Sequence, residues 1–236
     1  MLFRSYDNIF FALFPKCGGR CLDEYSDDQW SELGRLLARI HNVGAVCGAD
    51  ARIRLEPSIV TRNQTEKILQ SGLIPNDLRR EFSTVIDNLV NEIQPLFVDV
   101  EMNRLHGDCH FANIIHRPPE SFSIIDFDDM AVGPAIQDFW MLLPGLLEDS
   151  FVEADIFLEG YETFRSFDRR TLRLIEPLRA MRYVHFTAWC IHQVLEDGET
   201  RVMDNFGTHG YWQKEIKDLR DQLAIIRKAG PNVGNI

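Results

Sequence analysis

Three oxygen-bearing side chains fall within a short stretch of this chain, at a spacing that suits phosphoryl transfer. The segment L-H-G-D-C-H-F-A-N-I-I, residues 105–115, contains Asp108 and, five positions later, Asn113; the run S-I-I then ends at Asp126. Phosphoryl transfer to a hydroxyl needs one carboxylate that accepts the hydroxyl proton, and an amide oxygen and a second carboxylate that hold magnesium. We predict that Asp108 and Asp126 are catalytic, Asp108 as the proton acceptor, and that Asn113 and Asp126 bind Mg²⁺.

The elements around these residues are expected to bring them together. Asp108 follows the short apolar approach Arg104-Leu105, and Asn113 stands directly before Ile114-Ile115. Residues 114–115 and 122–125 read as a β-hairpin joined by residues 116–121. Such a hairpin places the residue before its first strand beside the residue that ends its second, so Asn113 and Asp126 should converge. Hard oxygen ligands of this kind suit Mg²⁺. The alternative, that these acids are solvated loop residues, does not explain three matched positions.

The same residues carry a family resemblance. The pattern H-G-D-x-H-x-x-N followed by I-D-F-D-D resembles the aminoglycoside phosphotransferase and choline kinase superfamily, which has the protein-kinase fold. Residues 14–20 (F-P-K-C-G-G-R) and 133–143 (G-P-A-I-Q-D-F-W-M-L-L) are most similar to the bacterial stress response kinases, regarded as serine/threonine protein kinases. The resemblance covers most of the chain, from about Tyr6 to the last helix. It implies a mostly helical α+β fold: a protein-kinase-like C-lobe with a remnant N-lobe strand and an inter-lobe linker.

The resemblance also implies roles for residues other than Asp108, Asn113 and Asp126. His106 would be a structural member of the catalytic loop, and Asp138 would support that loop from the helix behind it. The linker backbone would contact the adenine of ATP through Phe14, Pro15, Lys16 and Cys17. Two further roles stay open: His110 either touches phosphate or caps its turn, and Asp128 either approaches a second metal or is solvated.

A nucleotide cradle of the usual kind is missing from the sequence. Kinases hold the phosphates with a Gly-rich loop and a strand-borne Lys paired with a helical Glu. No G-x-G-x-x-G or G-x-x-x-x-G-K-[ST] motif occurs, and Gly18-Gly19 reads as a turn. We therefore expect residues 1–20 to be an N-lobe remnant, with one strand at 8–14, and residues 21–236 to be the C-lobe. A misassigned start, a fragment boundary or a shortened gene would each explain this, and we expect feeble or absent kinase activity from the chain as given.

Composition narrows the class of protein. The 236 residues are 45% hydrophobic and 26% charged, as in ordinary globular proteins, and the formal charge of −11 argues against nucleic acid or an anionic membrane as partner. Five cysteines without a C-x-x-C pair indicate free thiols in a reducing cytoplasm. A zinc cluster of Cys17, Cys21, His106 and His110 has no common ligand spacing. The apolar run at 9–14 reads as a strand rather than a signal peptide, and no stretch approaches the ~20 apolar residues of a membrane helix.

Helical periodicity predicts the remaining architecture. A capping box at Ser26 to Gln29 starts a helix to about residue 43, after which residues 44–57 read as irregular. Further helices are expected at 57–70, 76–93, 137–147, 150–165, 170–196 and 209–228. On the penultimate helix, five residues recur on one face and either look into an acceptor cleft or form an ordinary mixed face: Arg179, Arg182, His185, Trp189 and His192.

These observations favour an ATP- and Mg²⁺-dependent phosphotransferase that acts on protein Ser/Thr hydroxyls in a stress response, in the cytoplasm. Two alternatives stay open. One is a kinase for aminoglycosides or other small hydroxylated molecules, since acceptor choice depends on the helical cleft rather than on the catalytic loop. The other is a non-catalytic regulatory module derived from a kinase. A metal-dependent hydrolase is disfavoured, because the histidines lack ligand spacing with the acids.

Overall fold

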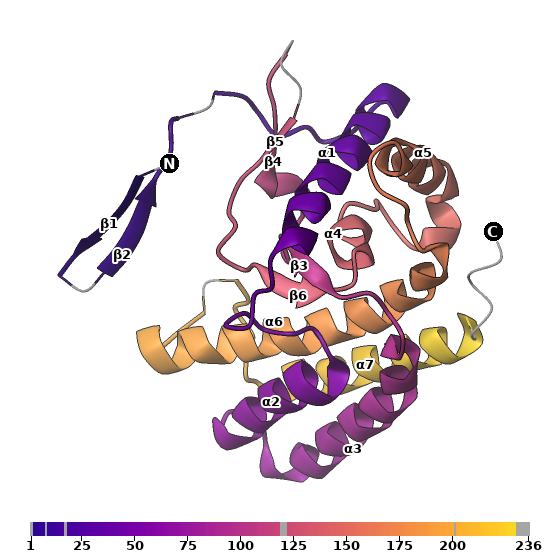
Figure 1. Cartoon of the computed structure of the whole chain (residues 1–236). Helices are drawn as coiled ribbons and strands as arrows, with labels where there is room; N and C mark the ends of the chain where they lie inside the picture. The colour runs from indigo at the N-terminus through magenta and orange to yellow at the C-terminus, as the bar shows by residue number, and fades with distance from the viewer. Residues whose placement is uncertain (1, 8, 17, 119–121, 201, 230–236) are drawn as a thin grey trace.

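The computed structural model describes residues 2–7, 9–16, 18–118, 122–200 and 202–229. The predicted mostly helical α+β fold is confirmed: helices make up most of the described residues, which also contain three small two-stranded sheets (Figure 1). Within the described ranges, no helix combines the length and the apolar character that crossing a bilayer demands.

One group of helices packs against residues 103–107, at the start of the predicted catalytic loop. α1 (Asp27–Val46) begins at the predicted capping box, where Gln29 Oε1 accepts the backbone N–H of Ser26 at 2.9 Å. It packs along α5 (Phe151–Glu162) so closely that a Cβ on Gly34 would lie 2.0 Å from the carbonyl oxygen of Phe157. Glycine at this position is what allows the close approach. The short α4 (Ile136–Trp140) completes this group, with Phe139 stacked on Phe157 at 4.3 Å between ring centroids.

A second group of four helices lies below the first in Figure 1. It comprises α2 (Pro57–Gln70), α3 (Asn76–Ile93), α6 (Ile175–Asp197) and α7 (His209–Ala229), which pack α2 on α3 and α6, and α7 on α3 and α6. Trp212 is fully buried at its centre, with its indole N–H donating to the carbonyl of Leu73 at 2.9 Å. Short 3₁₀ segments, at 94–97, 111–113, 147–149 and 169–174, connect the elements.

Two small sheets flank the predicted catalytic loop, residues 105–113, between the two helical groups. β3 (Asn103–Leu105) pairs antiparallel with β6 (Ala131–Gly133), and residues 53–55 hydrogen-bond to the other edge of β6 through Val132. β4 (Ile114–His116) and β5 (Phe122–Ile124) form the predicted hairpin, in the register Ile114↔Ile124. The catalytic loop therefore runs between two strands, each anchored to a different partner.

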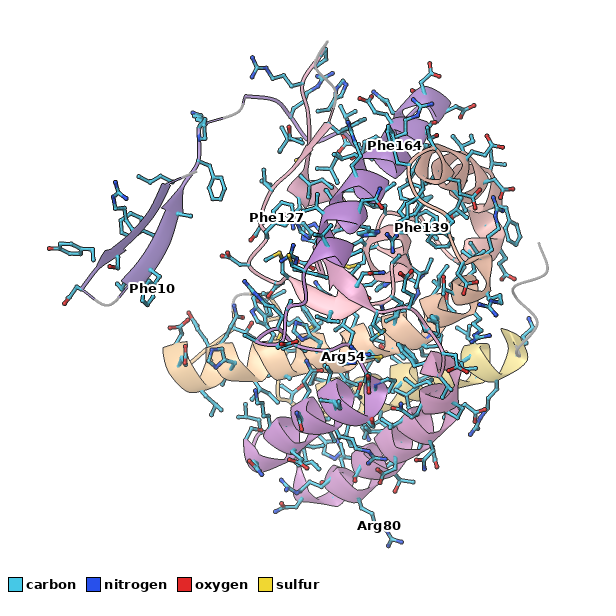
Figure 2. The ribbon with its side chains drawn as sticks, in the orientation of Figure 1. Phe10, Arg54, Arg80, Phe127, Phe139 and Phe164 are labelled. Atoms are coloured by element: carbon cyan, nitrogen blue, oxygen red, sulfur yellow. The ribbon has the colours of Figure 1, made fainter. Side chains whose placement is uncertain are left out.

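The N-terminal segment is a hairpin, which corrects the prediction of a single strand at 8–14. β1 (Leu2–Tyr6) pairs with β2 (Ile9–Leu13), and the hairpin projects away from the helical body (Figure 1). Figure 2 shows Phe10 on this hairpin, where it is 80% exposed, whereas Phe139 lies inside the body and is 1% exposed. The chain joins the body at Arg20, which exchanges backbone hydrogen bonds with His116 of β4.

Several predicted helix ends were wrong. The helix predicted at 137–147 stops at Trp140, because Pro144 follows and restricts the residue before it, Leu143. The helix predicted from 170 begins at Ile175, after a 3₁₀ segment, and α1 continues to Val46, through the first residues of the stretch predicted to be irregular. The other predicted helices lie within a few residues of their observed bounds.

Candidate active site

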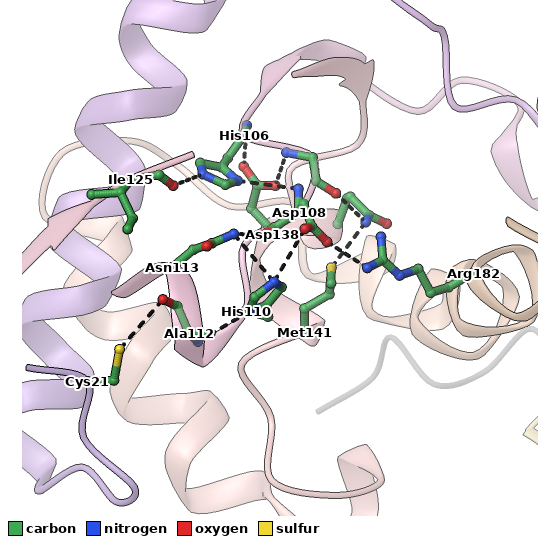
Figure 3. Close-up of polar contacts among 12 residues, drawn as sticks. Cys21, His106, Asp108, His110, Ala112, Asn113, Ile125, Asp138, Met141 and Arg182 are labelled. Atoms are coloured by element: carbon green, nitrogen blue, oxygen red, sulfur yellow. Dashed lines mark hydrogen bonds and ion pairs between the residues drawn. The ribbon is translucent and has the colours of Figure 1, made fainter. Parts of the chain in front are cut away.

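Asp138 holds the catalytic loop by its backbone. This carboxylate is fully buried on α4; its Oδ2 accepts the N–H of His106 and its Oδ1 accepts the N–H of Gly107, both at 2.8 Å. His41 of α1 lies 2.9 Å from the same Oδ2 through Nε2, and its Nδ1 lies 2.8 Å from the hydroxyl of Tyr161. Backbone amides that donate to a buried carboxylate form strong, short hydrogen bonds. The conformation of residues 106–107 is therefore set by Asp138 of α4 (Figure 3), which His41 of α1 contacts in turn.

His106 has both ring nitrogens occupied within the loop. Its Nε2 lies 2.8 Å from the carbonyl of Ile125, and its Nδ1 accepts the N–H of Asp108 at 3.3 Å. This pattern assigns the proton to Nε2, and the side chain is fully buried. His106 therefore joins the catalytic loop to the end of β5, one residue before Asp126.

Gly107 allows the catalytic loop to approach the loop after β5. Its φ is +88°, in the left-handed region, and a Cβ at this position would lie 2.2 Å from the carbonyl oxygen of Asp129. Only glycine combines that backbone conformation with that contact at low cost. The loop that carries Asp108 and the loop that carries Asp126 are packed directly together.

Asp108 sits between two basic side chains. Its Oδ2 lies 3.3 Å from Nε2 of His110, and its Oδ1 lies 2.7 Å from Nη2 of Arg182 on α6 (Figure 3). The contact with Arg182 is an ion pair without the angles of a directed hydrogen bond, since Oδ1 is buried and has no hydrogen-bond donor. His110 Nδ1 accepts the N–H of Ala112 at 3.2 Å, so this residue caps its own turn and directs Nε2 at Asp108. The Asp108 side chain as a whole is still 16% exposed, so these two contacts do not seal it from solvent.

Asn113 and Asp126 lie at the two ends of the same hairpin. The amide of Asn113 donates from Nδ2 to the carbonyl of Asp108 at 3.0 Å, which leaves its oxygen uncommitted, and its own carbonyl accepts the N–H of Ile125. Asp126 is exposed and has a φ of +64°, a strained value for a residue with a side chain. An amide oxygen and an exposed carboxylate on adjacent backbone positions form a hard-oxygen donor set, and this set fits Mg²⁺.

A cavity of about 230 Å³ opens beside the catalytic loop. Its wall includes Gly107, the two acids Asp128 and Asp129, and residues of α2 and α6. His185 of α6 lines it and contacts Nε2 of Gln64 through Nδ1 at 2.7 Å. Burial, and then the positive charge of Arg182, lower the pKa of His185. The cavity wall therefore carries two acidic groups and an imidazole whose pKa is lowered, beside Gly107 of the loop that bears Asp108.

Only some of the five α6 residues for which the sequence left two orientations open face the cavity. Arg182 and His185 face the cavity, whereas Arg179 contacts Glu176 at 3.1 Å and lies 5.0 Å above the ring of Trp140. Trp189 and His192 are exposed farther along the helix. Sequence reasoning therefore missed the contact between Arg182 and Asp108, and also His41. A polar residue spaced with the apolar face of α1 was the available signal for His41.

The predicted linker residues that the structure describes take part in none of the contacts given above, whereas Asp128 lies in the cavity wall. Phe14, Pro15 and Lys16 form an exposed extended segment between β2 and α1, and Cys17 lies outside the described residues, so their nucleotide role stays a prediction. Asp128 is exposed and its carbonyl accepts a hydrogen bond from Arg52 at 2.7 Å. Among the described residues, no cluster of three or more His, Cys, Asp or Glu side chains could hold a metal, and the four described cysteines are free.

Sequence comparison supports a kinase relationship over nearly the whole chain. Residues 4–175 match the profile of the family described as "Phosphotransferase enzyme family". The chain is 31% identical to stress response kinase A of Escherichia coli strain K12 over 230 residues, which is 95% of this chain and 68% of that relative. It is also 31% identical, over 225 residues, to a Salmonella typhimurium protein named serine/threonine protein kinase RdoA.

Structural comparison extends the similarity to small-molecule kinases. The fold resembles amicoumacin kinase, solved with AMP-PNP and Ca²⁺, with a TM-score of 0.65 at 18% identity over 88% of this chain. It also resembles spectinomycin phosphotransferase, solved with ADP and spectinomycin, with a TM-score of 0.60 at 17% identity over 97% of this chain. The chain spans 63% of the first of these chains and 74% of the second. At these identities the similarity concerns the fold, which is kinase-like.

Proposed function

The chain belongs to the phosphotransferase enzyme family, and we propose that its site transfers the γ-phosphoryl group of ATP to a hydroxyl in a magnesium-dependent reaction. The observation that carries this proposal is the arrangement of Asp108, Asn113 and Asp126 on two loops in direct contact at Gly107 and Asp129. The nucleotides named with the two structural relatives support ATP as donor. By family resemblance, the backbone of residues 14–17 contacts the adenine.

Asp108 is the proposed proton acceptor. Its side chain is 16% exposed and follows Gly107 of the cavity wall, so an acceptor hydroxyl bound in the cavity can reach the carboxylate. The proton passes to the carboxylate as the new O–P bond forms and the bond to the leaving ADP breaks. Asp138 is proposed to act indirectly. It fixes the backbone of His106 and Gly107, and through that backbone it sets the direction of Asp108.

Asn113 Oδ1 and the Asp126 carboxylate are the proposed magnesium ligands. Magnesium bound there would neutralise charge on the phosphates. The strained φ of Asp126 supports this role, since backbone strain of this kind collects at functional sites. The hydrogen bond from Asn113 Nδ2 to the carbonyl of Asp108 occupies the amide nitrogen, and among the described residues the amide oxygen has no hydrogen-bond partner.

We propose a serine or threonine hydroxyl of a protein as the acceptor, which the name of the Salmonella relative supports. One observation favours a second candidate, a small hydroxylated molecule. The cavity beside the loop of Asp108 measures about 230 Å³, and its wall carries two acids, Asp128 and Asp129, and two arginines, Arg52 and Arg182, which would suit a compact polar compound with several hydrogen-bonding groups.

The test is phosphoryl transfer from γ-labelled ATP, with and without Mg²⁺, in two acceptor reactions. One contains a mixture of generic protein acceptors, and the other contains a panel of aminoglycosides. Magnesium-dependent label in protein supports the first acceptor class, and label in an aminoglycoside supports the second; Asp108→Asn is the matched control for both. Because no Gly-rich loop motif occurs in the sequence, the transfer is expected to be feeble, and magnesium-dependent label above that of Asp108→Asn supports the proposal. Nucleotide binding without such label in either reaction would indicate a non-catalytic module and refute the proposed activity.

A further inference from the structure

The catalytic loop contains no cation of its own. Residues 105–116 include neither Lys nor Arg, although the transferring phosphoryl group carries negative charge that a kinase site must offset. His110 is engaged with the backbone of its own turn through Nδ1. A positive group that acts at Asp108 therefore has to come from another part of the fold.

Arg182 of α6 supplies such a group. Its Nη2 lies 2.7 Å from Asp108 Oδ1, and its side chain is 33% exposed. Of its five N–H donors, the described part of the chain engages only those at this nitrogen, in an ion pair without directed hydrogen-bond geometry. Arg182 also lines the cavity, together with Gly107. The guanidinium is thus held at the carboxylate while most of its binding capacity stays uncommitted.

Arg179, one turn earlier on the same helix, serves as a comparison, because its guanidinium is engaged in contacts within the protein. It donates to Glu176 at 3.1 Å and to the carbonyl of Gly145 at 3.3 Å, and it stacks 5.0 Å above the Trp140 ring. These contacts fasten α6 to the segment after α4. Arg182 lacks comparable partners among the described residues, so a fastening role explains Arg179 well and Arg182 poorly.

We propose that Arg182 is a catalytic residue whose guanidinium contacts both the Asp108 carboxylate and the phosphoryl group while that group is being transferred. This inference rests on the proposed function. The guanidinium keeps all its protons throughout: the acceptor proton goes to Asp108, the O–P bond forms, and the electron pair of the broken bond leaves with ADP. Its planar fork can hold a carboxylate on one edge and phosphoryl oxygens on another, which lysine cannot reproduce.

The decisive measurement compares the affinity of Mg²⁺·ADP with and without aluminium fluoride, which mimics the transferring phosphoryl group. For the unmodified protein, aluminium fluoride should tighten ADP binding. Arg182→Ala should lose most of that gain while its affinity for Mg²⁺·ADP alone stays the same, and Arg182→Lys should keep part of it. Arg179→Ala should keep the full gain, as the matched control on the same helix.

Turnover provides a second readout. Arg182→Ala should lower kcat by roughly 10²–10³-fold, the usual effect of removing one transition-state donor, with little change in KM for ATP. Added guanidinium ion should restore part of the rate, which a merely structural role would not permit.

The outcomes separate this inference from the function on which it rests. If Arg182→Ala retains the full aluminium fluoride gain, the role of Arg182 is refuted and the phosphotransferase proposal stands. If the unmodified protein binds Mg²⁺·ADP with no gain from aluminium fluoride and transfers no label, both are refuted.

Discussion

Replacing Asp138 by asparagine should destabilise the fold and disable the site together. The carboxylate accepts three hydrogen bonds, from His106 N, Gly107 N and His41 Nε2, at 2.8, 2.8 and 2.9 Å. An asparagine must turn its NH₂ group toward at least one of these donors. One charge-assisted hydrogen bond is then lost, worth about 1.5–3 kcal/mol, and a buried donor is left unpaired at about 1–3 kcal/mol more.

The expected loss in the free energy of unfolding is therefore about 3–5 kcal/mol, the range seen when one member of a buried ion pair is removed. Urea denaturation followed by circular dichroism measures it. Asp87→Asn is the matched control, because Asp87 pairs with Arg62 at 2.9 Å on the surface with 54% of its side chain exposed, and its loss should cost less than about 1 kcal/mol.

The same variant should turn over slowly even when folded, since Asp138 fixes Gly107 at a φ of +88° and so directs Asp108. Equal unfolding free energies for Asp138→Asn and Asp87→Asn would refute this account of the loop.

Three further predictions concern a helix contact, the base and a buried imidazole. Gly34→Ala should destabilise the protein by about 1–3 kcal/mol in thermal or urea unfolding, because the new methyl group would lie 2.0 Å from the carbonyl oxygen of Phe157. Asp108→Asn should lower kcat by ~10²–10⁴-fold without a loss of cooperative unfolding. The lowered pKa of His185 makes the folded state resist protonation, so stability should be present above pH ~6.5 and fall as the pH drops below it. His185→Gln should flatten that slope in denaturation curves measured from pH 5 to 7.

For each of these three predictions, one outcome would contradict the reasoning. Unchanged stability of Gly34→Ala would show that α1 and α5 can separate at no cost, while Gly48→Ala, with only Asp50 near the new atom at 3.6 Å, serves as its control. Near-normal turnover by Asp108→Asn would remove the proposed base. A pH slope that survives His185→Gln would assign the titration to another group.

Local sequence patterns were sufficient for the helices and for the β4–β5 hairpin. Apolar residues at helical spacing define the buried faces of α1 and α3, because that spacing depends only on the geometry of the helix itself. The hairpin is likewise a contact between neighbours in sequence. Where the local signal was weak, the prediction was wrong: α4 ends at Trp140, and β1 was missed.

The candidate site divides in the same way. The spacing of Asp108, Asn113 and Asp126 was legible because one loop and one hairpin carry them, and these need only short-range pairing to converge. Family resemblance pointed to Asp138, whose reach to the backbone of residues 106 and 107 spans α4 and β3. The contact of His41 with Asp138 and the strand-like pairing of residues 53–55 with β6 had no local signature.

The sequence by itself determined which groups could do chemistry and on which elements they stand. Only the tertiary structure decided what surrounds them: Arg182 at Asp108, the Gly107 backbone against Asp129, and the cavity between α2, α6 and the catalytic loop. The reason is physical. Hydrogen bonding and periodicity act between residues a few positions apart, whereas the meeting of α6 with the catalytic loop depends on how the apolar faces of two helical groups pack.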